Sequence, residues 1–253
     1  MTIQSKLTLI AVIIAGLPAA TVFPAEPTEI TQYTAEYEVQ YKGRRVARAQ
    51  FAVATDTAGQ FAFNSSTEAR GIWRLAAPKA AIERSLFGVE TGRIVPTSFR
   101  YEDGSRKGED NYSLEFDARG GEVRITSAVG KTSIDFEVGL LDRGSLQVAL
   151  MYDLGSCKLP GPYRYVDDGG ITEYRYERLD DLAVETEIGT IETVRFSQQR
   201  EGSSRHTILW LAPELSYLPV RIEQIRNGEI ETVFSIDALS GIESKSPNCS
   251  SLG

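Results

Sequence analysis

Alternation of apolar and polar residues with a period of two runs through most of this 253-residue chain. Between Gln32 and Tyr41, tyrosine, alanine and valine occupy every second position, and glutamate and glutamine fill most positions between them. Successive side chains of a β-strand point to opposite faces, so this pattern predicts strands with one buried face. Similar segments continue to residue 237. The chain is therefore predicted to be mostly β.

Short turns separate these segments, and most of the turns contain glycine. Asn227-Gly228 is the strongest hairpin signal, because both central positions of a type I′ turn require positive φ. Short connections predict consecutive antiparallel strands. Residues 171–178 and 183–186 are predicted to be two separate strands. A sheet of this length either packs on itself as a sandwich or curls, and we expect a large curved antiparallel sheet, a half-barrel or a barrel-like sheet.

One segment departs from the alternation. Residues 142–154, DRGSLQVALMYDL, place leucine and alanine at helical spacing. Asp142 or Ser145 can cap the start, and Gly155 suits the position after the last helical residue. The sequence predicts one main helix here, with its apolar stripe on the sheet.

The N-terminal segment has the layout of a secretory signal peptide. Lys6 precedes an uncharged apolar run from Leu7 to Leu17, and small alanines follow. Eleven residues are too few to span a bilayer, which takes about 20. We predict a signal peptide at 1–25, a single β-rich domain at 26–240 and a polar tail at 241–253. After removal of the signal, the exported protein would have no integral membrane span. No cysteine lies near the expected cleavage point, so a lipoprotein is not expected.

Charge and composition restrict the partners. The formal net charge is −8, which offers no electrostatic footprint for nucleic acid and predicts repulsion from anionic lipid surfaces. The basic run KGRRVAR at 42–48 is interpreted as solvated strand faces and turns. Cys157 and Cys249 predict either a disulfide or two buried thiols. One histidine and two distant cysteines predict no metal site, and no glycine pattern indicates a phosphate-bearing cofactor.

No catalytic motif stands out. A G-x-S-x-G elbow does not occur, and the single histidine, His206, lies within a predicted strand. The carboxylate pairs Asp167-Asp168 and Asp180-Asp181 lie beside glycine or in predicted turns, where aspartate caps its own backbone. The sequence favours a protein that is not an enzyme, with a hydrolase built on His206 as the alternative.

Three passages together resemble a known family. They are GLLDRGSLQVAL, VETEIGTIETVRF and ILWLAPELSYLPVRIEQIRNGE, and the segment from Trp210 to Val220 is the most specific. The chain resembles the bacterial exported family called domain of unknown function 3108 over residues 33–239, although Gly144 stands where a better helix former is expected. The resemblance implies a periplasmic β-rich protein and transfers no catalytic residue. The layout is also similar to that of the lipoprotein-carrier half-barrels, which implies acyl chains on the concave face.

The resulting hypothesis is a periplasmic binding or carrier protein for a lipid or a lipidated protein. The alternative is an envelope scaffold with no ligand cavity. The oligomeric state stays open. From apolar character alone, the residues predicted to line the ligand site are Trp73, Leu75, Phe87, Leu146, Leu150 and Trp210.

Overall fold

The computed structural model describes residues 29–244 and Cys249. The predicted signal peptide lies outside the described residues, as does most of the predicted polar tail. Among the described residues, no helix has the length and apolar character needed to cross a membrane.

Within residues 29–244, fifteen strands form one sheet. Their order is β8-β7-β6-β5-β4-β3-β2-β1-β15-β14-β13-β12-β11-β10-β9. Strands β9 and β10 pair in parallel, and the other described pairs are antiparallel. Among the described strands, no pairing joins β8 to β9, so the sheet is not closed. The strands are β1 (Tyr33–Tyr41), β2 (Arg44–Thr55), β3 (Phe61–Ala69), β4 (Ala81–Glu90), β5 (Arg93–Glu102), β6 (Tyr112–Asp117), β7 (Glu122–Ser127), β8 (Gly130–Asp135), β9 (Leu140–Leu141), β10 (Tyr163–Asp167), β11 (Gly170–Thr186), β12 (Gly189–Gln199), β13 (Arg205–Ala212), β14 (Leu218–Arg226) and β15 (Glu229–Ser240).

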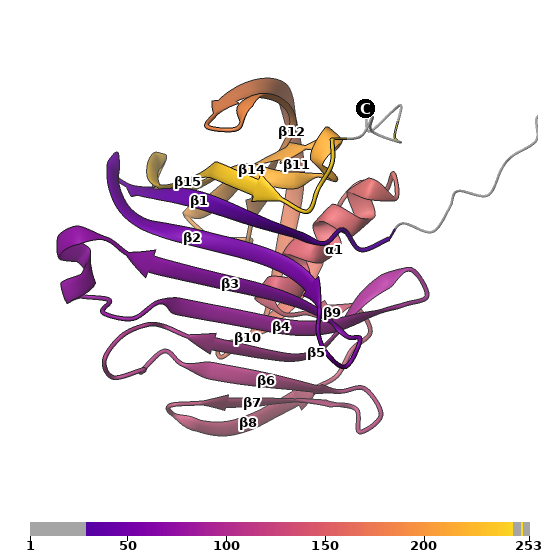
Figure 1. Ribbon diagram of the computed structural model, residues 1–253. Helices are drawn as coiled ribbons and strands as arrows, with labels where there is room; N and C mark the ends of the chain where they lie inside the picture. Colours follow the sequence, from indigo (N-terminus) through magenta and orange to yellow (C-terminus); the bar gives the residue numbers. More distant parts are fainter. Residues whose placement is uncertain (1–28, 245–248, 250–253) are drawn as a thin grey trace, which may run out of the picture.

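The sheet curves around α1 (Arg143–Gly155), the one α-helix among the residues that the structure describes. Figure 1 shows β1–β8 as one wall, with the later strands turning behind it and α1 on the inner side. Leu146 and Met151 of α1 belong to a cluster with β1, β2 and β3, whereas Leu150 and Leu154 pack with Phe196 and Leu211 of β12 and β13. The helix therefore fills the concave side between the two halves of the sheet. The predicted mostly β, half-barrel-like fold with one main helix is confirmed.

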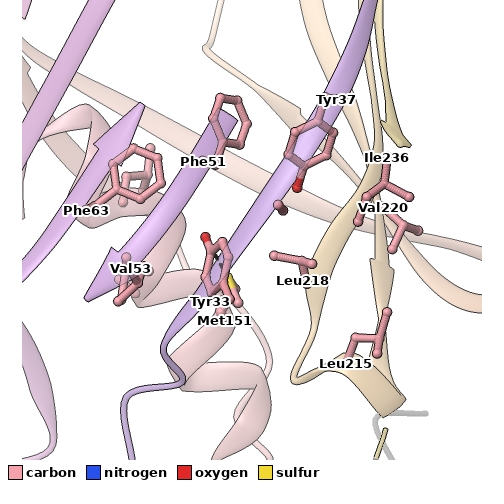
Figure 2. Close-up of a cluster of buried hydrophobic side chains, with 14 of the residues drawn as sticks. Tyr33, Tyr37, Phe51, Val53, Phe63, Met151, Leu215, Leu218, Val220 and Ile236 are labelled. Atoms are coloured by element: carbon pink, nitrogen blue, oxygen red, sulfur yellow. Dashed lines mark hydrogen bonds between the residues drawn. The ribbon is translucent and has the colours of Figure 1, made fainter. Parts of the chain in front are cut away.

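The main hydrophobic core lies beside β1, the strand that joins the two halves of the sheet. Figure 2 shows Tyr33, Tyr37 and Phe51 facing Leu218, Val220 and Ile236 of the later strands. Tyr37 is fully buried, and its hydroxyl donates to the carbonyl oxygen of Pro219 at 2.8 Å. This bond satisfies a polar atom that would otherwise be costly to bury. Tyr33 and Tyr37 of the first alternating segment are thus core residues.

The start of α1 is held by a capping box. The Asp142 carboxylate accepts hydrogen bonds from the backbone N–H groups of Gly144 and Ser145, both at 2.9 Å, and from Ser85 Oγ at 2.8 Å. The Ser145 hydroxyl in turn accepts from the Asp142 N–H at 2.9 Å. These bonds satisfy N–H groups that have no partner inside the helix.

Glycine occupies position 144 because of side-chain packing and not because of its helix propensity. A Cβ at this position would lie 2.7 Å from Phe63 Cδ1 and 2.8 Å from Ser85 Cβ. The first turn of α1 therefore approaches β3 and β4 more closely than a side chain allows. Close approach outweighs the roughly 1 kcal/mol helix penalty of glycine.

Asp142 predicts an unusual pH dependence. Burial raises its carboxyl pKa to about 6, although the hydrogen bonds from Ser145 and Ser85 oppose the shift. Since the folded pKa exceeds the unfolded value, the folded state binds more protons between pH 4 and 6, and this residue's contribution to stability falls as the pH rises through that window. As the pH rises through that window, the free energy of unfolding of the wild type should fall by up to about 3 kcal/mol relative to that of Asp142→Asn, which does not titrate at this position. Urea denaturation of both proteins at pH 4, 5, 6 and 7 measures the difference, and a constant difference would contradict the prediction.

The predicted elements differ from the structure in a few places. The helix is confirmed, with Asp142 as its N-cap, and the Asn227-Gly228 turn has φ of 53° and 82°. The prediction of two separate strands at 171–178 and 183–186 is wrong, because β11 is continuous and shifts its register between Leu179 and Leu182. Asp180-Asp181 therefore lies in a strand irregularity, not in a turn.

Candidate functional site

A cavity of about 820 Å³ lies on the concave side of the sheet. Both halves of the sheet line it, and α1 contributes Arg143, Leu146, Gln147 and Leu150. Its volume falls in the range of roughly 300–1,000 Å³ that is usual for small-molecule sites. The remaining wall residues are Phe51, Phe63, Ser65, Thr67, Ala81, Glu83, Tyr101, Tyr165, Tyr174, Tyr176, Gln198, Arg200, Ser203, Arg205, His206, Thr207, Leu209, Pro219, Ile222, Gln224, Ile225, Arg226, Glu231 and Phe234.

The alternation of side chains along a strand explains why most of these residues face the cavity. In β3 the lining positions are 63, 65 and 67, in β11 they are 174 and 176, and in β14 they include 222, 224 and 226. Alternate residues share a face of a strand, so each curved strand presents a row to the concave side. Gln198, Thr207 and Gln224 are direct neighbours across β12, β13 and β14. They form a polar strip on the wall.

The cavity interior combines apolar and aromatic surfaces. Phe51, Phe63, Leu146, Leu150 and Phe234 supply the apolar part. The rings of Tyr165 and Tyr174 stack with centroids 5.2 Å apart. The Tyr176 hydroxyl accepts a hydrogen bond from Gln198 Nε2 at 2.7 Å. Burial raises the pKa of Tyr176 well above its ordinary value, so this hydroxyl is an uncharged polar group in the wall.

One ion pair stands inside the cavity wall. Arg143 Nη1 lies 2.8 Å from Glu83 Oε1, and the Arg143 guanidinium lies 5.2 Å from the centre of the Tyr101 ring. Because the arginine retains free donors beyond the one bonded to Glu83, it can still bind an acceptor on a ligand. The pair and the polar strip therefore give the cavity polar contact points beside its apolar surface.

The residues predicted to line a ligand site divide into two groups. Leu146 and Leu150 line the cavity. Phe87 does not, because it is wholly buried in the core. Trp73 and Leu75 lie on the outer surface, in the 3₁₀ turn η1 (Gly71–Leu75). Trp210 does not line the cavity either, and the Arg195 guanidinium lies 4.6 Å from the centre of its ring.

His206 lies at the solvent-exposed end of the cavity, half-buried on β13. Within residues 29–244 and Cys249, no hydrogen bond joins its imidazole to a serine or a carboxylate; Ser203 Oγ instead accepts from the backbone N–H of Arg205 at 3.1 Å. The described part of the chain also contains no group of three or more histidine, cysteine, aspartate or glutamate side chains placed to hold a metal ion.

Cys157 and Cys249 form a disulfide, with their Cα atoms 5.3 Å apart. Cys157 lies two residues after the end of α1, so the bond ties Cys249 to the end of the helix. It lies apart from the cavity lining.

Comparison with known proteins defines the family. The family profile described as protein of unknown function DUF3108 matches residues 36–235. The chain belongs to DUF3108. The predicted resemblance is therefore confirmed. A search of curated proteins finds no match for this DUF3108 chain.

Solved structures include similar folds. A β-barrel-like protein of the domain of unknown function DUF1849 from Brucella abortus aligns with a TM-score of 0.50 at 8% identity, covering 86% of this DUF3108 chain and 100% of that chain. A candidate lipoprotein from Parabacteroides distasonis aligns with a TM-score of 0.33 at 10% identity, covering 83% and 95%. A candidate exported protein with a YmcC-like fold from Bacteroides fragilis gives 0.32 at 10% identity, covering 83% and 94%. The first similarity shows a shared fold and nothing about activity.

Sequence reasoning missed most of the wall of this DUF3108 cavity. Tyr101, Arg143, Tyr165 and Gln198 were not singled out because apolar character alone selected the candidates. A usable signal was present in β11, where Tyr174 and Tyr176 occupy alternate positions of a strand. Which strand faces meet across the cavity depends on the curl of the sheet, which no local pattern encodes.

Proposed function

We propose that this DUF3108 protein binds an amphiphile, either a lipid or the acyl group of a lipidated protein, and carries or retains it in the periplasm. The observation that supports this proposal is the 820 Å³ cavity between the halves of the sheet. Its apolar and aromatic interior suits a hydrocarbon tail, and polar groups beside it suit a head group. The proposed role is binding without chemical conversion.

The periplasmic location rests on the N-terminal leader pattern. The disulfide agrees with it, since disulfides persist in oxidising compartments and are rare in the cytosol. The scaffold alternative, which requires a filled interior, is disfavoured by the cavity volume. The hydrolase alternative lacks a hydrogen-bonded partner for His206 among the described residues, and we do not propose it.

Blocking the cavity should weaken amphiphile binding. Thr207 faces the cavity from β13, so the indole of Thr207→Trp should occupy the ligand space and weaken the binding of a dansyl-labelled fatty acid by about tenfold or more, which corresponds to about 1.4 kcal/mol. Fluorescence titration of the purified, disulfide-bonded protein measures the affinity.

Ile208→Trp is the matched control, because its neighbouring position on the same strand does not line the cavity. This variant should bind the probe as the wild type does. The proposal fails if the wild type does not bind the probe, or if Thr207→Trp and Ile208→Trp retain equal affinity.

A further inference from the structure

One edge of the sheet gathers connections that lie far apart in the sequence, and four of them are neighbours along it. They are the β12–β13 turn at 200–204, the β14–β15 turn at 227–228, the β1–β2 turn at 42–43, and η1. Backbone hydrogen bonds link neighbours along this edge, from Asn227 N to Ser204 O at 3.1 Å and from Lys42 N to Glu231 O at 2.7 Å. We call these connections, with residues 41–45, 70–75, 200–205 and 226–231, the mouth edge.

The cavity opens at this edge. Arg200, Arg205 and Arg226 are exposed and also line the cavity. The opposite end of the concave side is filled by Leu215, Leu218 and other residues of the main core. A ligand therefore has access to the cavity from the mouth edge.

Large apolar side chains project from the mouth edge into solvent. Ile72 is 77% exposed and Leu75 is 79% exposed, and Trp73 packs edge-on against Tyr41 at a centroid distance of 6.5 Å. No residue of η1 is buried. Figure 1 shows η1 as the short magenta coil between β3 and β4, beyond the ends of the strands. These side chains contribute little to the core, so the fold itself does not account for them.

The mouth edge is strongly basic in an acidic protein. It carries eight arginine and lysine residues against the three glutamates Glu201, Glu229 and Glu231, although the whole chain has a net charge of −8. All eight basic residues are exposed. Arg45 pairs with Glu38, but the side chains of six arginines form no ion pair with any residue that the structure describes. Those six are Arg44, Arg70, Arg74, Arg200, Arg205 and Arg226.

We propose that the mouth edge docks on an anionic phospholipid bilayer. Ile72, Trp73 and Leu75 insert at the level of the head groups, and the surrounding guanidinium groups bind lipid phosphates. Tryptophan and aliphatic side chains on a projecting turn, bordered by unpaired cations, are the chemistry that an anionic membrane interface attracts.

Docking in this orientation brings the cavity opening against the bilayer. Each lysine or arginine near an anionic surface strengthens binding by roughly fivefold. The attraction is local and falls off within a Debye length, so clustered cations act even on a protein of net negative charge.

Vesicle flotation tests the proposal with the mature, disulfide-bonded protein. Vesicles of phosphatidylcholine with phosphatidylglycerol should carry the wild type to the top of the gradient, whereas vesicles of phosphatidylcholine alone should not, and added salt should weaken binding. Ile72→Asn with Leu75→Asn, and separately Arg44→Gln with Arg74→Gln, should each lower the partition coefficient by about tenfold or more. These side chains are exposed, so both variants should keep the wild-type unfolding midpoint.

Val138→Asn is the matched control, because Val138 is 81% exposed and follows β8 toward the opposite edge of the sheet. It should float as the wild type does. Equal binding to both vesicle types, unchanged binding of the two mouth-edge variants, or no vesicle binding by the wild type would overturn the proposal, and the last result would point to a protein partner. Thr207→Trp should still bind anionic vesicles, so failure of cavity binding and failure of membrane docking are separate results.

Discussion

Replacing Phe87 by alanine is expected to lower the free energy of unfolding by about 3–5 kcal/mol. Phe87 has no exposed surface, and its ring stacks on Phe61 with the centroids 5.9 Å apart. Removing the ring loses its burial and leaves a void beside α1 and β3 that close-packed neighbours fill only in part. Guanidinium denaturation, followed by far-ultraviolet circular dichroism, measures the change.

Leu75→Ala serves as the control for this experiment. Leu75 shared the predicted role of lining a ligand site, yet it is 79% exposed, so its truncation should change the unfolding free energy by no more than about 0.5 kcal/mol. If Phe87→Ala instead left stability unchanged and weakened binding of the fatty-acid probe, Phe87 would belong to the ligand site and its assignment to the core would be wrong.

Loss of the disulfide is the second large effect. The Cys157–Cys249 bond joins residues 92 positions apart, and such a long loop restricts the unfolded chain strongly. Replacing both cysteines by serine is expected to lower the free energy of unfolding by about 2–4 kcal/mol. Urea denaturation of the wild type and the double variant measures the loss.

Reduction supplies an independent check of the same bond. Dithiothreitol should destabilise the wild type to the level of the double serine variant and should leave that variant unchanged. Mass spectrometry after alkylation of the unreduced, unfolded wild type should find no modified cysteine. Alkylation of both residues would show that the thiols are free and would remove the basis of the expected effect.

The helix and the hairpins were predictable because their causes are local. Asp142 caps a backbone N–H two residues further along the chain, and Asn227 and Gly228 adopt positive φ within one turn. The continuity of β11 was less accessible, because neighbouring strands preserve its pairing on both sides of the acidic pair at 180–181. Local composition predicted an interruption there, but hydrogen bonds to the neighbouring strand keep β11 continuous.

The cavity lining was predictable only in part. Leu146 and Leu150 lie on the apolar stripe of the predicted helix, and that stripe faces the cavity as well as the core. Trp73 and Phe87 have similar apolar character, but one lies on the surface and the other in the core. Hydrophobicity shows that a side chain favours leaving water, and not whether protein, ligand or membrane will cover it.

The net charge predicted repulsion from anionic lipid, yet the tertiary structure separates the charges in space. Lys42, Arg74, Arg205 and Arg226 are spread over most of the chain and meet at one edge of the sheet. Antiparallel connections return to the same edge at every second turn, which brings distant turns together. The net charge is a sum over all residues, so it gives no information about how the charges are arranged in space.

Local sequence was enough to specify most of the strands, the capped helix and the polarity of each strand face, because these depend on dihedral preferences and side-chain alternation within a few residues. Folding of the sheet created the cavity between its halves, brought Cys157 to Cys249, and placed basic and apolar turns around the cavity opening. Curvature and strand pairing set those distances, and both arise from contacts between segments that are remote along the chain.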